Sequence, residues 1–244
     1  MALVETCFLW FVFYSVIGGI YETLLCSIEQ KRFINRGFLN GPYCPIYGCG
    51  AILNILILGE IQDPLLLFPA AVLLTGVLEY LTSWGMEELF HARWWDYSEK
   101  RFNINGRVCL AGAIAFGAFS LVQIKYLHPP ISSYIAMIPD NMRFVISLTL
   151  FTLLFIDTVY TITKFSELEE VLQDAADLID DAVQSVKTLY EKASTSYHGT
   201  FRKINSQIRR MLFSFPRLKS MRYNERLKML RELIKIEKDG DKQS

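Results

Sequence analysis

Five apolar stretches constrain the fold of this chain more than any other feature of its sequence. A helix needs about 20 predominantly apolar residues to cross the hydrocarbon core of a bilayer. Most of these stretches reach or approach that length, and 52% of the 244 residues are hydrophobic. The pattern predicts an all-α fold, a polytopic membrane helix bundle of about five spans. We place the spans at Leu3–Ile28, Ile46–Gly59, Leu65–Ser83, Val108–Ile124 and Phe144–Thr163.

The second stretch, Ile46–Gly59, is the weakest of the five. It is short, and glycines and prolines crowd its start. A broken or re-entrant helix is therefore the alternative to a complete span.

Charged residues divide the chain into two parts. Of the 25 Lys and Arg residues, 9 precede Lys164 and 16 lie from it onward, whereas the 25 Asp and Glu residues divide into 12 and 13. This predicts a transmembrane domain over residues 1–163 and a charged helical tail over residues 164–244. The net charge of zero argues against a general nucleic-acid-binding function.

The tail has its own periodicity. From Phe165 to Ala193, apolar residues recur at alternating steps of three and four, which is the spacing of a coiled-coil seam. Residues 164–198 have a net charge of −5 and residues 199–244 one of +8. Opposite charges favour an antiparallel helical hairpin or coiled coil in the cytoplasm. Docking to a partner and binding to anionic lipid are the alternatives.

Basic residues in the loops predict the orientation of the spans. The loops after spans one to four contain three, no, four and two Lys or Arg residues, and a basic tail follows. Because cytoplasmic loops are enriched in basic residues, we expect the N-terminus outside and the C-terminus in the cytoplasm.

Three acidic residues, Glu22, Glu79 and Asp157, fall inside predicted spans. A charge at the centre of a membrane helix costs roughly 2.5–3.5 kcal/mol on insertion scales, so each requires an explanation. Glu22 and Glu79 lie on helix faces that also contain small residues, which predicts that the two helices face each other or a wet cavity. Two interpretations of Glu22 and Glu79 stay open, namely that they line a functional cavity or that they make buried structural hydrogen bonds. For Asp157, an interfacial pair with Lys164 is the simpler interpretation.

The loop between spans one and two, residues 35–48, combines turn-forming and aromatic residues. Asn35, Arg36 and Asn40 offer hydrogen-bond donors to an anion or to Glu22. The functional interpretation is a half-helix entrance of the kind that transporters place around a substrate. The alternative is a tight turn with a purely architectural role.

The loop after span three contains a second polar run. Its Trp and Tyr side chains fit an interfacial aromatic belt, but Asp96 and Asn103 are not explained by that role. The Asn105-Gly106 pair predicts a sharp turn before Arg107. Arg107 is then a candidate partner of Asp96 or Glu79.

Familiar catalytic and metal-binding motifs are missing from the sequence. It has no P-loop and no hydrolase motif, and its cysteines and histidines lack ligand spacing. We therefore expect no metal, no cofactor and no enzyme activity of a known hydrolase class.

The runs 35–48 (NRGFLNGPYCPIYG), 94–98 (WWDYS) and 102–110 (FNINGRVCL) resemble the CmpB-like family of ABC-transporter type IV permeases of bacterial membranes. The resemblance covers roughly residues 8–160 and implies a multi-pass protein of the bacterial inner membrane. Its motif positions in this chain are Glu22, Asn35, Arg36, Gly37, Gly41, Pro42, Pro45, Tyr47, Gly48, Glu79, Trp95, Asp96, Tyr97, Asn103, Gly106 and Arg107.

Three functions are consistent with these features. The leading hypothesis is a permease-like subunit of the bilayer, energised by a separate ATPase and able to form a homodimer, in which Glu22 and Glu79 bind a cation or proton. In that hypothesis the two glutamates can instead orient Arg36 and Arg107 toward an anionic group. A non-catalytic membrane anchor that gathers partners through its tail is the second. A membrane enzyme acting on a lipid headgroup, with Asp96, Glu79 and Arg107 at its centre, is the third.

Overall fold

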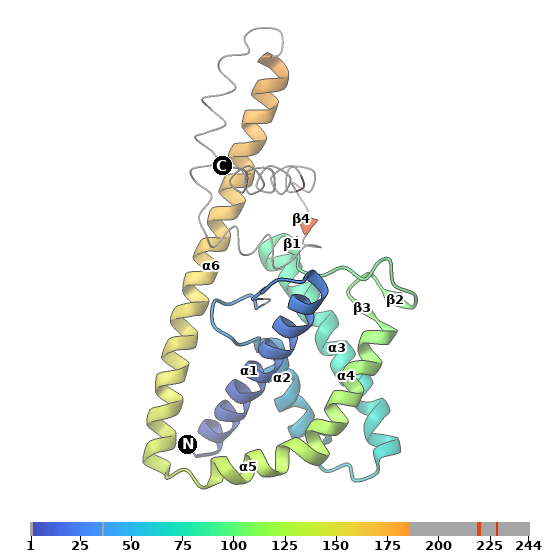
Figure 1. Cartoon of the computed structure of the whole chain (residues 1–244), viewed down its shortest axis with the longest axis vertical. Helices are drawn as coiled ribbons and strands as arrows, with labels where there is room; N and C mark the ends of the chain where they lie inside the picture. The colour runs from blue at the N-terminus through green and yellow to red at the C-terminus, as the bar shows by residue number, and fades with distance from the viewer. Residues whose placement is uncertain (1, 36, 186–218, 221–227, 229–244) are drawn as a thin grey trace. The chain divides into compact units, whose positions relative to one another are not determined.

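The computed structural model describes residues 2–35, 37–185, 219, 220 and 228, and helices make up most of this part (Figure 1). The chain divides into two compact units. The first comprises residues 1–85 and 95–159, and the second comprises residues 86–94 and 160–244.

Helices account for most of the first unit. They are α1 (Ala2–Gln30), α2 (Pro45–Leu53), α3 (Pro64–Phe90), α4 (Leu110–Val122), α5 (His128–Ala136) and α6 (Asp140–Ser185), of which α3 and α6 extend into the second unit. Two π-helical turns, η1 (Asn54–Leu58) and η2 (Gln123–Leu127), directly follow α2 and α4.

Four helical segments in the described part of the chain are long and apolar enough to cross a membrane. They are Leu3–Ile28, Pro64–Phe90, Leu110–Ala136 and Asp140–Glu167, whereas Pro45–Leu58 is shorter. The predicted membrane helix bundle is confirmed, including the shortness of its second apolar segment. Pro45–Leu58 is too short to cross a hydrocarbon core as a straight helix, because a complete span takes about 20 residues.

The third long segment continues past its predicted end at Ile124. The π-helical turn η2 carries the chain into α5, so the helical run extends to Ala136. Pro129 and Pro130 do not interrupt it, because they occupy the first turn of α5, where a missing amide donor costs little.

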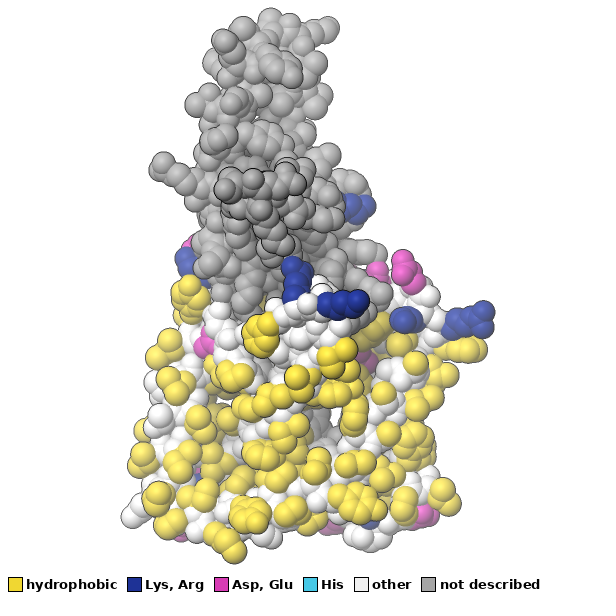
Figure 2. Space-filling view, viewed as in Figure 1, with side chains coloured by type: hydrophobic (Ala, Val, Ile, Leu, Met, Phe, Trp, Pro, Cys, Tyr) yellow, Lys and Arg dark blue, Asp and Glu magenta, His cyan; other side chains and the backbone are white. Residues whose placement is uncertain are grey.

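Large apolar side chains cover the outer surface of these helices, as Figure 2 shows for one face. Leu73 of α3 is 70% exposed and Phe155 of α6 is 58% exposed. A protein in water would bury such side chains, whereas lipid solvates them without cost. The surface therefore supports a bilayer environment.

Close packing of α1 and α2 depends on glycines. The ring of Tyr47 lies directly against Gly18, and the Ser15 hydroxyl lies directly against Gly48, so neither glycine has room for a β-carbon. The amide of Cys44 donates to the carbonyl of Ser15 over 2.8 Å, which fixes the start of α2 on α1.

A short hairpin precedes α4. Strands β2 (Asn103–Ile104) and β3 (Val108–Cys109) pair antiparallel, and Asn105 and Gly106 between them both have positive φ, of 52° and 68°. Asn-Gly is the preferred pair for such a turn because both residues tolerate this conformation. The predicted sharp turn is confirmed, and the two strands around it are an addition to the expected all-helical fold.

The second unit has an aromatic cluster and an ion pair. Phe165 of α6 packs against Phe90 and Trp94, with ring centroids 5.0 and 4.7 Å apart. Arg93 donates to both carboxylate oxygens of Glu87, over 2.9 and 3.1 Å. Strand β1 (Ala92–Arg93) pairs antiparallel with β4 (Lys219–Ser220).

Helix α6 includes the first part of the predicted heptad seam, because it continues from Phe165 to Ser185. The remainder of the seam and the predicted second and third tail helices lie outside the described residues, apart from single positions. The antiparallel tail hairpin therefore stays a prediction.

Candidate functional site

Glu22 of α1 binds a tyrosine from α2. The Tyr47 hydroxyl donates to Glu22 Oε1 over 2.6 Å, which is a short, charge-assisted distance. Tyr47 reaches Glu22 because its ring lies against Gly18, one helical turn earlier on α1. The small residue that the sequence places on the Glu22 face is therefore what admits the donor.

Glu79 of α3 has an equivalent arrangement with a tyrosine from the loop after α3. Its carboxylate accepts a hydrogen bond from the Tyr97 hydroxyl. Glu79 is only 5% exposed, and its Oε2 has no hydrogen-bond partner among the described residues. A buried carboxylate oxygen in this state costs free energy unless a ligand or solvent molecule satisfies it.

The structure brings these two acids into one site. Glu22 lies near enough to both Glu79 and Tyr97 to act on them electrostatically. We call Glu22, Tyr47, Glu79 and Tyr97 the carboxylate cluster. The sequence placed both acids on faces that meet a helix or a cavity, and direct contact between these two faces stays a prediction.

The environment of Tyr97 favours its neutral hydroxyl. Burial raises the pKa of Tyr97 above its ordinary value, and the negative charge of Glu79 raises it further. Tyr97 therefore remains a hydrogen-bond donor to Glu79 over the whole physiological pH range.

A third acid of the first unit, Asp157 of α6, receives four hydrogen bonds from described residues of the loop after α1. Asp157 Oδ1 accepts from the amide and side chain of Asn40, over 3.2 and 2.9 Å. Asp157 Oδ2 accepts from the Gly41 amide over 2.9 Å and from the Tyr43 hydroxyl over 2.6 Å. We call this arrangement the Asp157 clasp. It attaches α6 to the loop that leads into Tyr47.

The interpretation of Asp157 as a partner of Lys164 is wrong. Lys164 binds Glu167, three residues further along α6, and the Asp157 carboxylate is taken up by the clasp. A carboxylate with four donors is better stabilised than one in an exposed ion pair, because each donor replaces a hydrogen bond to water. Burial raises the pKa of Tyr43, and the charge of Asp157 raises it further, so the clasp keeps its hydroxyl donor.

The other predicted residues of this loop shape it. The Asn35 side chain donates to the Asn40 carbonyl over 3.0 Å and accepts from the Gly37 amide over 3.3 Å. Pro45 occupies the first turn of α2, and the Pro42 carbonyl lies against Gly19. Arg36 lies outside the described residues. Its proposed part in the site stays a prediction.

The predicted residues of the loop after α3 make mainly local contacts. The Asp96 carboxylate accepts from the amide and hydroxyl of Ser98. Asn103 donates to the carbonyls of Ser98 and Lys100 and accepts from the Gly106 amide. These bonds give the loop a fixed conformation of its own.

Two further bonds connect this loop to its hairpin, and Arg107 of the hairpin contacts α3. The Trp95 indole donates to the Arg107 carbonyl over 2.9 Å, and the Tyr97 amide donates to the Gly106 carbonyl over 2.7 Å. Arg107 places its guanidinium 5.3 Å from the ring centre of Tyr80, on α3. The hairpin therefore holds Tyr97 in position beside Glu79.

Tyr43, Tyr80 and two buried amides, Asn54 and Gln123, are missing from the predicted site. The sequence search considered only ionisable residues within apolar spans, so it did not include amides. Asn54 and Gln123 also lie in apolar stretches, and a search for any strongly polar side chain in such a stretch would have found them. For Tyr43 and Tyr80, a tyrosine near a membrane interface gives no local sign of the partner it binds.

The described residues contain no group of three or more His, Cys, Asp or Glu side chains arranged to hold a metal ion. The carboxylate cluster instead pairs each acid with a phenol. This donor set suits a proton or one monovalent cation better than a divalent metal, which takes several oxygen ligands.

Residues 9–162 match the model of a protein family described as "Putative ABC-transporter type IV". The match contains the carboxylate cluster, the Asp157 clasp and all but the start of the first unit. Neither curated proteins nor solved structures give a match.

Proposed function

Because the chain belongs to this ABC-transporter type IV family, with more than half of its residues inside the match, we propose that it is a permease-like membrane subunit. Its carboxylate cluster is the polar site, near the cytoplasmic side, and binds a cation or a proton. A separate ATPase supplies energy, since the sequence has no P-loop.

The observation that supports this proposal is that Glu22 lies close enough to the buried Glu79 to act on it electrostatically, in a bundle with an apolar outer surface. Two carboxylates in a low-dielectric environment repel each other unless positive charge is shared between them. Tyr47 and Tyr97 each supply a hydrogen bond to one of these carboxylates. A bound cation or proton reduces the repulsion, and the burial of Glu79 makes this gain larger.

The Asp157 clasp supports a transport function over a purely anchoring one. It fixes the loop from Asn40 to Tyr43, and this loop continues into Tyr47, which binds Glu22. Helix α6 is one continuous helix from Asp140 to Ser185, so it connects the membrane segment with the start of the tail. We propose that the tail docks the ATPase.

The test is to isolate the tagged full-length protein from membranes of its native host and to measure ATP hydrolysis by the material that copurifies. We expect an ATPase subunit, and we expect Glu79→Gln to lower its turnover. Thr149→Val is the matched control, because Thr149 is exposed on α6 and its hydroxyl bonds only to the Val145 carbonyl.

Two results contradict the proposal. If no ATPase copurifies, the permease function fails and the anchor and enzyme functions take precedence. If an ATPase copurifies but Glu22→Gln and Glu79→Gln hydrolyse ATP like the unmodified protein, the carboxylate cluster is not part of its cycle.

A further inference from the structure

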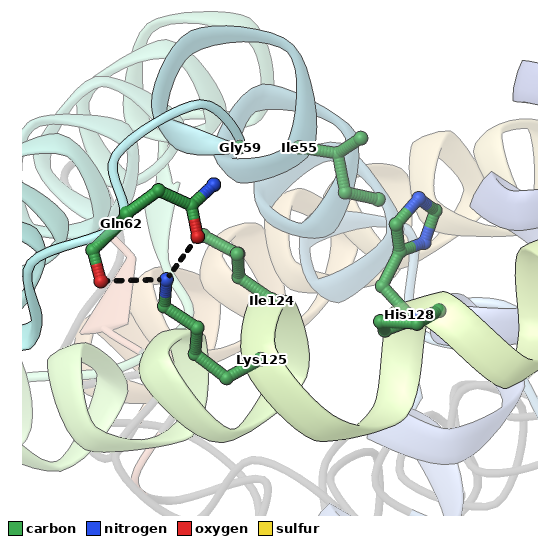
Figure 3. Close-up of a pocket in the computed structure, with 7 residues that line it drawn as sticks. Ile55, Gly59, Gln62, Ile124, Lys125 and His128 are labelled. Atoms are coloured by element: carbon green, nitrogen blue, oxygen red, sulfur yellow. Dashed lines mark hydrogen bonds between the residues drawn. The ribbon is translucent and has the colours of Figure 1, made fainter.

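A pocket of about 300 Å³ lies in the first unit, between the end of the α2–η1 segment and the η2–α5 segment (Figure 3). Four of the residues that line it are apolar or glycine, and three, Gln62, Lys125 and His128, are polar. Pockets that bind small molecules have volumes of about 300–1,000 Å³ and combine apolar walls with a few polar groups. This pocket has that composition, and its volume suits a small molecule.

A π-helical turn contributes to each wall of the pocket. Ile55 belongs to η1, and Ile124 and Lys125 belong to η2. Such turns occur often at functional sites. The buried side chain of Asn54, at the start of η1, donates to Oε1 of the buried Gln123, at the start of η2, over 3.2 Å. This bond fixes the two walls on each other.

Lys125 brings a positive charge to the pocket. Its ammonium group donates to the carbonyls of Ile61 and Gln62 and to Gln62 Oε1, over 3.1, 2.8 and 3.2 Å. Figure 3 shows the two bonds to Gln62. These acceptors are dipoles without net charge, and no carboxylate of the described residues forms an ion pair with Lys125. The neighbouring acids Glu60 and Asp63 do not line the pocket.

Gln62 can change from an acceptor to a donor. Its side chain is exposed, and its Oε1 is the one acceptor of Lys125 that can turn away without a change in the backbone. Rotation of the amide exchanges the positions of Oε1 and the NH2 group. An anion that replaces Oε1 beside Lys125 therefore gains a bond from the ammonium group and one from this NH2 group.

His128 offers a further donor, and α1 holds its ring in place. The Tyr14 hydroxyl lies 3.4 Å from His128 Nδ1, and the Trp10 ring packs edge-on against the imidazole with centroids 4.6 Å apart. Because Tyr14 occupies Nδ1, the nitrogen that is left for a ligand is Nε2.

Gln123 decides which nitrogen of a neutral His128 carries the proton. Its Oε1 accepts from Asn54, so its NH2 group donates to the Ala51 carbonyl and to the Tyr14 oxygen. The hydroxyl hydrogen of Tyr14 is then available to His128 Nδ1, which places the imidazole proton on Nε2. In the charged imidazolium Nε2 carries a proton as well. His128 is therefore a donor at Nε2 in both states.

We propose that this pocket binds a small organic anion, a carboxylate with a short apolar chain. The carboxylate accepts from the Lys125 ammonium group and from His128 Nε2, with the Gln62 amide as a third donor, and the apolar chain lies against Ile55 and Ile124. Lys125 and His128 are three residues apart on one helical run and line the same pocket, so one carboxylate can span them. The site goes beyond the proposed function, because it shares no residue with the carboxylate cluster.

Charge is what selects this class of ligand. A cation would be repelled by Lys125, and the repulsion is stronger in a partly buried site than in water. A neutral molecule would leave the charge of Lys125 without a counter-charge. The apolar wall in turn favours a carboxylate with a short chain over a small inorganic anion.

The test is equilibrium dialysis of radiolabelled hexanoate against the full-length protein in phosphatidylcholine nanodiscs, with empty nanodiscs to measure uptake by lipid. Unlabelled hexanol and hexylammonium are competitors that share the chain and lack the carboxylate. Lys125→Met keeps an aliphatic side chain without the charge, and His128→Phe keeps an aromatic ring without Nε2. Lys100→Met is the matched control, because Lys100 is exposed in the loop after α3 and does not line the pocket.

We expect saturable binding of hexanoate to the unmodified protein and to Lys100→Met, without displacement by hexanol or hexylammonium. Lys125→Met should weaken binding at least about tenfold, because a hydrogen bond between charged groups is lost. His128→Phe should weaken it as well. Because Lys125 also holds the backbone of Ile61 and Gln62, elution from a sizing column decides whether Lys125→Met is folded. If it is not, His128→Phe carries the test.

Four results overturn the proposal. The first is no saturable uptake above that of empty nanodiscs. The second is equal affinity of the unmodified protein and both pocket variants, which places the anion elsewhere. The third is displacement by hexanol or hexylammonium as effective as that by hexanoate, because the carboxylate is then not recognised. The fourth is loss of binding when phosphatidylglycerol is added to the nanodiscs, because a lipid anion then fills the pocket.

Discussion

The Tyr43 hydroxyl donates a 2.6 Å hydrogen bond to Asp157 Oδ2, across 114 residues of sequence. This bond belongs to the Asp157 clasp, which holds the loop before α2 on α6. Hydrogen bonds to a charged group contribute about 1.5–3 kcal/mol each, so the clasp is one of the stronger polar attachments in the first unit.

We expect Asp157→Asn to release the loop. The asparagine side chain keeps one acceptor oxygen, but its NH2 group then faces the donors that bonded to the second carboxylate oxygen of Asp157. At least one hydrogen bond of the clasp is therefore lost. The reactivity of the adjacent Cys44 with a maleimide, followed by mass spectrometry in native membranes, should rise at least about tenfold if about 1.4 kcal/mol of closure is lost. Buried Cys26 and Cys109 serve as internal references.

The control for this change is Thr152→Val, an exposed position on α6 whose hydroxyl bonds only to the Leu148 carbonyl. It should leave Cys44 reactivity unchanged. Equal reactivity of Cys44 in Asp157→Asn and in the unmodified protein would show that the clasp does not hold the loop.

Gly48→Ala should destabilise the contact between α1 and α2. A β-carbon at this position meets the Phe11 carbonyl and the Ser15 hydroxyl, and backbone atoms cannot move aside cheaply. Overpacking of this kind typically costs about 1–3 kcal/mol, and the melting temperature in detergent should fall accordingly.

Gly85→Ala on α3 is the matched glycine variant. Nothing lies within 4 Å of a β-carbon at that position. Alanine favours a helix over glycine by about 0.8–1.0 kcal/mol, so this change should leave the melting temperature the same or raise it. If both alanine variants behave alike, the close packing at Gly48 is not a determinant of stability.

Stability should fall at alkaline pH because of Tyr97. Its pKa is raised in the folded protein, so the folded state holds the phenol proton more tightly than the unfolded state does. The resulting stabilisation is complete below the unfolded pKa of about 10 and is lost as the pH rises through the higher folded value. Melting temperatures measured from about pH 8 to about pH 11 should show this decline.

The variant Tyr97→Phe should flatten the alkaline decline, although Tyr43 contributes in the same direction. Tyr134→Phe, at a side chain that is 70% exposed, should keep the profile of the unmodified protein. An unchanged profile in Tyr97→Phe would contradict a stabilising bond between Tyr97 and Glu79.

The ion pair of the second unit should contribute measurably to stability. Arg93 contacts both carboxylate oxygens of Glu87, and the two side chains are 18% and 9% exposed. A double-mutant cycle with Arg93→Met and Glu87→Gln, followed by thermal unfolding, should give a coupling of about 1–3 kcal/mol. A coupling below about 0.5 kcal/mol would place the pair with ordinary surface ion pairs.

Much of the fold could be predicted because the deciding features are local. The length of an apolar run sets whether a helix can cross the bilayer, and Asn105 and Gly106 alone specify their turn. Gly18 likewise indicates that a neighbouring helix packs closely against the face of α1 that contains Glu22. The continuation of the helix past Ile124 was missed, because a π-helical turn and prolines in a first helical turn have no clear periodic signature.

What the sequence by itself determined is which segments enter the membrane and which polar residues they take with them. Only the tertiary structure decided how those residues pair. Asp157 binds Asn40, Gly41 and Tyr43 and not the nearby Lys164, and Asn54 binds Ser120 and Gln123. The physical reason is that the apolar content of a single helix decides whether that helix enters the membrane. The partner of a buried polar group depends instead on how neighbouring helices rotate and pack, because a hydrogen bond forms only with a group within about 3 Å.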